Sequence, residues 1–83
     1  MPKNVLIVDN DFFFVKFLGE LLKERGYHVF QAFDGKQGLA VLEEQMVDYV
    51  FVDIIMPRID GKLFIDFIRE KYSDAEFSII GVS

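Results

Sequence analysis

Asp48 to Gly61, with the sequence DYVFVDIIMPRIDG, decides the fold of this chain. Its unbroken apolar run, Tyr49 to Val52, is typical of a strand buried on both faces, as parallel strands between helices are. Asp53 ends that run, and Pro57 and then Asp60-Gly61 predict a loop after it. We therefore expect Asp53 at the carboxyl end of a strand, which is where open α/β sheets bind their ligands.

Length and composition limit what this chain can be. Its 83 residues predict one small domain, spanning 1–83. The net charge of −5 and the lack of any cluster of Lys or Arg argue against nucleic-acid binding. The absence of cysteine excludes disulfides and thiolate metal sites. No apolar run approaches the roughly 18–20 residues of a membrane span, and the first residues do not resemble a signal peptide, so we expect a soluble, cytoplasmic protein.

Strand and helix patterns alternate along the chain. We expect strands at 5–8, 27–33, 49–52 and 77–82, and helices at 12–25, 36–45 and 62–72. Gly26 is expected to end the first helix, and Asp34-Gly35 to form a turn. The less apolar strand at 27–33 is expected at an edge of the sheet. Such alternation predicts right-handed βαβ crossovers and a parallel sheet with the architecture (βα)₃β.

Apolar spacing predicts which face of each helix is buried. The residues expected to face inward are Phe14, Leu18, Leu21 and Leu22, flanked by Val15 and Phe17, in the first helix; Leu39, Leu42 and Met46 in the second; and Phe64, Ile65, Phe67 and Ile68 in the third. Phe12 and Phe13 fall at the margins of the polar face. We favour burial for these two rings over a partner surface, because most phenylalanines of such a chain lie in its core.

Acidic residues follow both of the most apolar strands. Asp9 and Asn10 come directly after the first strand, as Asp53 comes after the third. The most apolar strands should be central, so their carboxyl ends lie side by side and these side chains converge. Carboxylate and amide oxygens suit Mg²⁺, and such a metal would screen a carboxylate from an incoming phosphoryl group. A single acid at a strand end more often caps a helix, as Asn10 or Asp11 could here, but acids after both strands favour a site.

Four segments, VLIVDND (5–11), AFDG (32–35), DYVFVDIIMPRIDG (48–61) and IIGVS (79–83), resemble the receiver domain of two-component response regulators in order and spacing. The resemblance covers the whole chain. It implies a flavodoxin-like α/β fold with strand order 2-1-3-4. It also implies a signalling module, not an enzyme, that accepts a phosphoryl group from a histidine kinase or a phosphotransfer protein.

The resemblance also implies a role for each candidate residue. Asp53 would be the phosphoacceptor, and Asp9 and Asn10 would hold Mg²⁺ together with Asp53 and the backbone carbonyl of Ile55. Ser83 matches the hydroxyl residue that bonds the phosphoryl oxygen and switches rotamer. The family usually has a second acid where this chain has Asn10. Because an amide oxygen brings no charge, we expect weaker Mg²⁺ binding.

A receiver continues past the position of Ser83 through another helix, a fifth strand with a lysine and a last helix, so we interpret these residues as a partial receiver domain. On that interpretation, one sheet face over the third and fourth strands stays uncovered. The residues left in water would be Tyr49 or Val50, and Phe77 or Ile79, according to register. We expect a homodimer that buries this face or pairs the two fourth strands.

Two other functions are considered. Asp9-Asn10-Asp11 after an apolar strand also resembles the DxD motif of haloacid dehalogenase-type phosphatases, with Asp9 as nucleophile, Asp11 as general acid and Ser83 in the second motif. That alternative leaves the Asp53 segment unexplained. The other is a degenerate receiver that serves as a docking module without phosphotransfer, with Phe12 and Phe13 in its contact surface.

Overall fold

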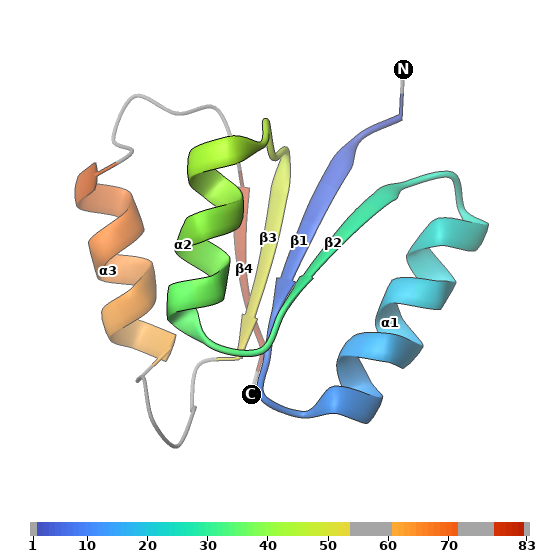
Figure 1. Ribbon diagram of the computed structural model, residues 1–83, viewed down its shortest axis with the longest axis horizontal. Helices are drawn as coiled ribbons and strands as arrows, with labels where there is room; N and C mark the ends of the chain where they lie inside the picture. The colour runs from blue at the N-terminus through green and yellow to red at the C-terminus, as the bar shows by residue number, and fades with distance from the viewer. Residues whose placement is uncertain (1, 54–60, 72–77, 83) are drawn as a thin grey trace.

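Strands and helices alternate throughout the computed structural model, which describes residues 2–53, 61–71 and 78–82, without the side chains of 61–64 and 82. The elements are β1 (Asn4–Val8), α1 (Phe12–Glu24), β2 (His28–Ala32), α2 (Gly35–Glu44), β3 (Tyr49–Asp53), α3 (Gly61–Lys71) and β4 (Ser78–Val82) (Figure 1). All strand pairs are parallel, in the order β2-β1-β3-β4. The predicted (βα)₃β architecture, its strand order and the edge position of β2 are confirmed.

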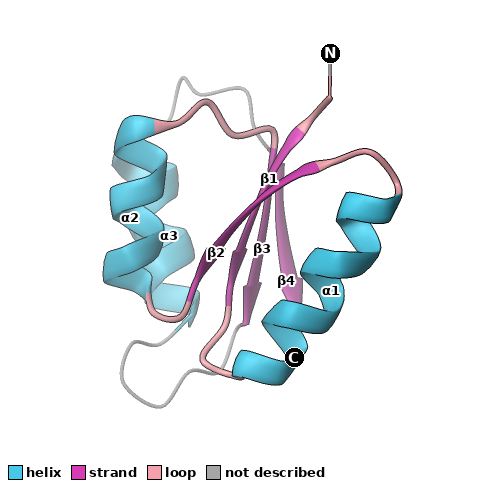
Figure 2. Cartoon of the chain, turned by 45° about the vertical axis from the view of Figure 1, so that its right-hand side comes forward, coloured by secondary structure: helices cyan, strands magenta, loops and turns pink. Residues whose placement is uncertain are grey.

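The sheet lies between two helical layers, with α1 on one face and α2 and α3 on the other (Figures 1 and 2). Successive residues of a strand point to opposite faces. In β1, Leu6 and Val8 therefore join the cluster under α2 and α3, while Val5 and Ile7 join the cluster under α1. All four are at most 1% exposed, which explains why this strand is apolar without a break from Val5 to Val8. None of the described helices is long and apolar enough to cross a membrane.

The residue that ends α1 is the one expected from the sequence, but an expected turn is the start of α2. Gly26 ends α1 with a positive φ of 91°, a conformation that glycine adopts without strain. Asp34 is the N-cap of α2: its side chain accepts a hydrogen bond from the Gln37 N–H at 2.8 Å. The expected turn at Asp34-Gly35 is therefore the start of a helix.

The face of α1 that meets the sheet differs from the predicted one. Val15 and Gly19 are its buried residues, whereas Leu21 and Phe17, which were expected inside or beside the core, are 41% and 65% exposed. A Cβ added at Gly19 would lie 2.8 Å from the side-chain nitrogen of Gln31 on β2. The missing side chain lets the helix approach β2 along its Gly19 side, which turns Phe17 and Leu21 outward. The half-buried members of the expected face are Phe14, Leu18 and Leu22.

Two further predictions of burial are wrong. Met46 is 85% exposed, because α2 ends at Glu44 and the next residue, Gln45, is already extended. Phe67 of α3 is 48% exposed, whereas Ile68, which was predicted to face inward with it, is fully buried. The predicted inward side chain at 64 lies outside the described residues.

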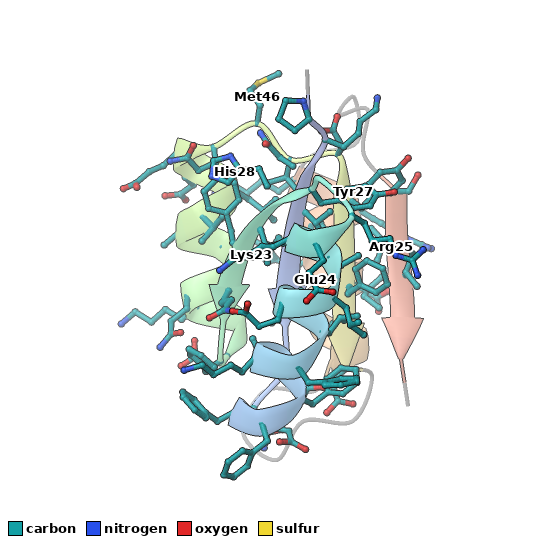
Figure 3. The ribbon with its side chains drawn as sticks, turned by 90° about the vertical axis from the view of Figure 1, so that its right-hand side faces the viewer. Lys23, Glu24, Arg25, Tyr27, His28 and Met46 are labelled. Carbon is teal, nitrogen blue, oxygen red and sulfur yellow. The ribbon has the colours of Figure 1, made fainter. Side chains whose placement is uncertain are left out.

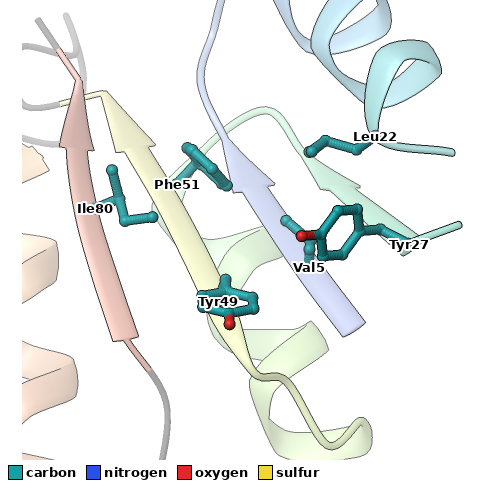
Figure 4. A pocket seen from close by; sticks show the side chains of 6 residues that line it. All are labelled: Val5, Leu22, Tyr27, Tyr49, Phe51 and Ile80. Carbon is teal, nitrogen blue, oxygen red and sulfur yellow. The ribbon is translucent and has the colours of Figure 1, made fainter. Parts of the chain in front are cut away.

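Strand register shows which residues face the groove beside α1. Tyr49 pairs with Ser78 and Phe51 with Ile80. Val50 and Ile79 pack in the cluster on the opposite face, below α2 and α3. The groove has a volume of about 250 Å³ and is lined by Val5, Leu22, Tyr27, Tyr49, Phe51 and Ile80 (Figure 4). The apolar sheet face predicted from the sequence is therefore formed by Tyr49 and Phe51, not by Val50, and Phe77 lies outside the described residues.

Candidate functional site

Asp9 and Asp53 lie at the ends of two neighbouring strands. Val8 of β1 pairs with Val52 of β3, so the next residue of each strand occupies the same level of the sheet. Parallel neighbours are about 4.8 Å apart and residues at one level point to the same face. Asp9 is 7% exposed, and Asp53 is half-buried. The structure thus brings together the two carboxylates that the sequence places after the most apolar strands.

Hydrogen bonds fix the position of Asp9. Its backbone N–H donates to the Ala32 carbonyl of β2 at 3.1 Å. One of its carboxylate oxygens, Oδ1, accepts a hydrogen bond from the Asp11 N–H at 2.9 Å. A buried carboxylate held in this way is preorganised, since its orientation does not have to be found when a ligand binds.

The charge of Asp9 is unfavourable in this position. Burial raises the pKa of Asp9, the hydrogen bond from the Asp11 N–H opposes the rise, and the nearby Asp53 and Asp11 carboxylates raise the pKa further. A side-chain hydrogen bond with Asp53 acts in the same direction. Two acids that repel each other at the carboxyl edge of a sheet form an environment that a bound cation would stabilise.

Asn10 and Asp11 differ in what they do. Asn10 is exposed, directly after the buried Asp9. Asp11 is the N-cap of α1: its Oδ1 accepts a hydrogen bond from the Phe14 N–H at 3.1 Å. Either Asn10 or Asp11 could cap this helix by sequence, and in the structure the N-cap is Asp11.

The remaining candidates are not part of the described structure. Ile55 and Ser83 both lie outside the described residues. Val82, the residue before Ser83, is the β4 partner of Asp53 in the sheet.

Asp9 and Asp53 are better suited to bind a magnesium ion that keeps most of its waters than a metal ion that is held by protein ligands alone. Within residues 2–53, 61–71 and 78–82, no group of three or more acidic, histidine or cysteine side chains could hold a metal. Mg²⁺ is usually bound through one or two carboxylates and keeps several waters. The buried Asp9 beside Asp53 could supply that number of charged ligands, and Asn10, which is exposed and next in sequence, stays a predicted neutral ligand.

Aromatic rings beside the carboxylates were misjudged from the sequence. Phe12 and Phe13 are 53% and 82% exposed, so the prediction that they are buried is wrong. The Phe12 ring stacks on Phe33 with a centroid distance of 5.6 Å, and the Lys16 Nζ lies 5.5 Å from its centre. The exposure of Phe13 follows from the rotation of α1, because Phe13 lies on the helix side opposite the buried Val15 and Gly19. These rings form an apolar rim at the start of α1.

The family model that matches this chain describes the response regulator receiver domain, and it matches residues 5–83. A curated relative, the response regulator GtcR from Aneurinibacillus migulanus, is 31% identical over 72 residues, which are 87% of this chain and 30% of GtcR. The chain spans less than a third of the length of the first curated relatives.

Solved receiver structures have the same fold. Chemotaxis response regulator CheY4 of Vibrio cholerae superposes with a TM-score of 0.89 and 26% identity, over 98% of this chain and 68% of CheY4. Response regulator TrrA from Thermotoga maritima, solved in complex with Mg²⁺ and BeF, gives a TM-score of 0.83 and 27% identity, over 98% of this chain and 87% of TrrA.

Proposed function

This chain belongs to the response regulator receiver domain family, and from that premise we propose that Asp53 is its phosphoacceptor and that Mg²⁺ supports the transfer. Receiver domains of this family are modules of two-component response regulators and interact with histidine kinases or phosphotransfer proteins. The observation that carries the proposal is the placement of Asp53 beside the buried Asp9, whose pKa is raised by burial and by its acidic neighbours. Such a pair is suited to hold a cation and then to receive an anionic group.

Asp53 acts as the nucleophile. A carboxylate oxygen of Asp53 attacks the phosphorus of a phosphohistidine, the phosphorus–nitrogen bond breaks, and the electron pair of that bond returns to the imidazole, which takes up a proton. The product on this chain is an acyl phosphate. Asp53 is half-buried at a strand end, where an approaching donor can reach it while the β3 backbone holds it in place.

Asp9, Asn10 and Asp53 are the metal-binding side chains of the proposal, with the Ile55 backbone carbonyl as a further ligand. Bound Mg²⁺ supplies positive charge that offsets the repulsion between the carboxylates and the incoming phosphoryl oxygens. The neutral Asn10 makes this affinity lower than it would be with an acid at that position. We propose that the Ser83 hydroxyl hydrogen-bonds a phosphoryl oxygen.

The family match gives no support to the phosphatase alternative. That alternative makes Asp11 a general acid, whereas the role of Asp11 in the structure is to cap α1 by accepting the hydrogen bond from the Phe14 N–H. A docking module without phosphotransfer is the second candidate, in which the exposed rings of Phe12 and Phe13 would form the contact surface. The cytoplasmic location and the lack of nucleic-acid binding stay predictions.

Intact-mass spectrometry after incubation with acetyl phosphate tests the proposal. We expect a single phosphoryl adduct that requires Mg²⁺, disappears in Asp53→Asn and persists in the matched control Asp34→Asn. Asp34 caps α2 through the same type of hydrogen bond that Asn can make, so this control keeps the fold while it removes another acid. An adduct on the Asp53→Asn variant would contradict the assignment. No adduct on any form would favour the docking module.

A further inference from the structure

The start of α1 contacts the end of β2 through a pair of stacked rings. The Phe12 and Phe33 rings have a centroid distance of 5.6 Å and an interplanar angle of 23°. Aromatic rings at such a distance attract each other beyond the area that they bury. Phe12 is the first residue of α1, and Phe33 directly follows β2. Figure 3 shows the start of α1, in blue, at the carboxyl ends of β1 and β2, away from the labelled Lys23 and Glu24 of its last turn.

Phe33 is the fixed partner of this pair. Its backbone N–H donates a hydrogen bond to Gln37 Oε1, in the first turn of α2, at 2.9 Å. Its half-buried ring packs against the buried cluster between α1 and the sheet. Different elements therefore hold the backbone and the side chain of Phe33. The ring offers Phe12 a surface whose position is set by the rest of the fold.

The stacked pair lies beside the candidate metal site. Ala32, the last residue of β2, pairs with Val8 of β1. The residues that follow them, Phe33 and Asp9, therefore occupy one level of the sheet. The Asp9 N–H donates to the Ala32 carbonyl at 3.1 Å, which continues the pairing of the two strands to Asp9. Because neighbouring strands are about 4.8 Å apart, the stack begins one strand away from the buried Asp9 carboxylate.

A short connection joins Asp9 to the stacked ring of Phe12. It consists of Asn10 and Asp11, hereafter the β1–α1 connection. The Asp11 N–H donates the hydrogen bond to Asp9 Oδ1 at 2.9 Å, and Asp11 is bonded directly to Phe12. Since consecutive Cα atoms are a constant distance of about 3.8 Å apart, the position of Phe12 limits where the Asp11 N–H can lie. A Phe12 ring released from the stack would let the connection move, and the Asp9 carboxylate would lose its fixed donor.

The exposure of Phe12 distinguishes this contact from core packing. Phe12 is 53% exposed although its ring is stacked on Phe33. The Lys16 Nζ lies 5.5 Å from the centre of the Phe12 ring, within the range of a cation–π contact that also restrains the ring. A side chain that stays half in water contributes less to the core than a buried one. The pair is therefore better suited to position the β1–α1 connection than to stabilise the core.

We propose that Phe12 and Phe33 are positioning residues, whose stacked rings hold the β1–α1 connection so that the Asp9 carboxylate is in place for a cation. This inference rests on the proposed function, in which Asp9 binds Mg²⁺ beside Asp53. The rings act through the Asp11 N–H and need no contact with the ion. Loss of the stack lowers Mg²⁺ affinity by about two- to tenfold, which is the range that aromatic pairs of this kind contribute.

Magnesium titration of the whole chain, followed by the NMR amide signals of Asp9 and Asp53, tests this proposal. Phe12→Ala and Phe33→Ala should each raise the Mg²⁺ dissociation constant about two- to tenfold. The double variant should bind no more weakly than the weaker single one, because either change removes the same stack. Phe12→Tyr keeps the ring and should keep the parent affinity. Phe17→Ala, the matched control at another exposed ring of α1, should keep it as well.

Amide hydrogen exchange of the metal-free chain is the second measurement. In Phe12→Ala the Asp11 N–H should exchange about two- to tenfold faster relative to the amides of β1, a ratio that a general loss of stability does not produce. Unchanged exchange at Asp11 would overturn the proposal, and so would a Phe12→Ala variant with the parent's Mg²⁺ affinity or a double variant with additive losses.

The two measurements also separate this inference from the proposed function. A parent chain whose Asp9 and Asp53 signals do not respond to Mg²⁺ would contradict the metal site of the proposed function. The exchange rate of the Asp11 N–H needs no metal, so it decides in either case whether the rings position the β1–α1 connection.

Discussion

Asp11 links the stability of α1 to the geometry of the candidate site, and its two roles can be separated by substitution. Its side chain accepts the capping hydrogen bond from the Phe14 N–H at 3.1 Å, whereas its backbone N–H donates to Asp9 Oδ1 at 2.9 Å. Of these two hydrogen bonds, Asp11→Ala removes only the first. Loss of an N-cap of this kind costs about 1 kcal/mol of unfolding free energy. In a domain of this size that is about 4–8 °C in the thermal midpoint.

Asp11→Asn is the matched control, because it keeps a side-chain oxygen for the cap and removes the charge. Its unfolding free energy should stay within about 0.5 kcal/mol of the parent chain. Urea denaturation followed by circular dichroism measures both variants, and phosphoryl uptake from acetyl phosphate should persist in both. If Asn is as destabilising as Ala, Asp11 does not act as a cap. If Asn abolishes phosphoryl uptake, the Asp11 carboxylate belongs to the reactive site.

Three other predictions concern the buried acid, the helix contact and the core. Folding raises the pKa of Asp9, so the carboxyl of the folded protein binds a proton more tightly than that of the unfolded chain. The stability of the protein therefore falls as pH rises from the pKa of Asp9 in the unfolded chain through its pKa in the folded protein. In Mg²⁺-free buffer Asp9→Asn should therefore have a higher thermal midpoint than the parent at neutral pH. Its stability should also fall less than that of the parent as pH rises through the acidic range. A lower midpoint for Asp9→Asn at neutral pH would contradict the electrostatic argument. Gly19→Ala should be tolerated in urea denaturation, because the only close approach of its Cβ is to the flexible end of Gln31, the contact with Val29 at 3.6 Å is an ordinary one, and helix propensity favours Ala by up to about 1 kcal/mol. Gly19→Leu should cost about 1–3 kcal/mol. Equal costs for the two variants would argue against close contact of α1 with β2. Ile68→Ala should cost about 2–5 kcal/mol because that side chain is fully buried, and Phe67→Ala, half-exposed on the same helix, should cost clearly less in the same assay.

The order of the elements and the meeting of Asp9 with Asp53 could both be predicted from the sequence. The reason is that four consecutive apolar residues precede each acid, Val5 to Val8 before Asp9 and Tyr49 to Val52 before Asp53, as expected for strands buried on both faces. Central strands of a parallel sheet end at one edge, so the acids that follow them are neighbours. Register then adds the fact that Asp9 and Asp53 share one level of the sheet.

The rotation of α1 could not be predicted from apolar spacing. The helix has phenylalanine or leucine on nearly every side, so a periodic pattern identifies a broad face and not a particular one. Gly19 decides between the possibilities, because the side of the helix without a side chain can approach Gln31 of β2 most closely. The choice between Tyr49 and Val50 at the groove was likewise a matter of register, since alternation along β3 fits either face until its pairing with β1 is known.

The central claim, that Asp53 accepts the phosphoryl group, is tested most directly by locating the modified residue. Borohydride reduces an acyl phosphate of aspartate to homoserine, and peptide sequencing by tandem mass spectrometry then identifies the position. After incubation with acetyl phosphate and Mg²⁺, we expect homoserine at position 53 and at no other acid. Homoserine at position 9, with Asp53 unmodified, would contradict the claim and support the phosphatase type of chemistry instead.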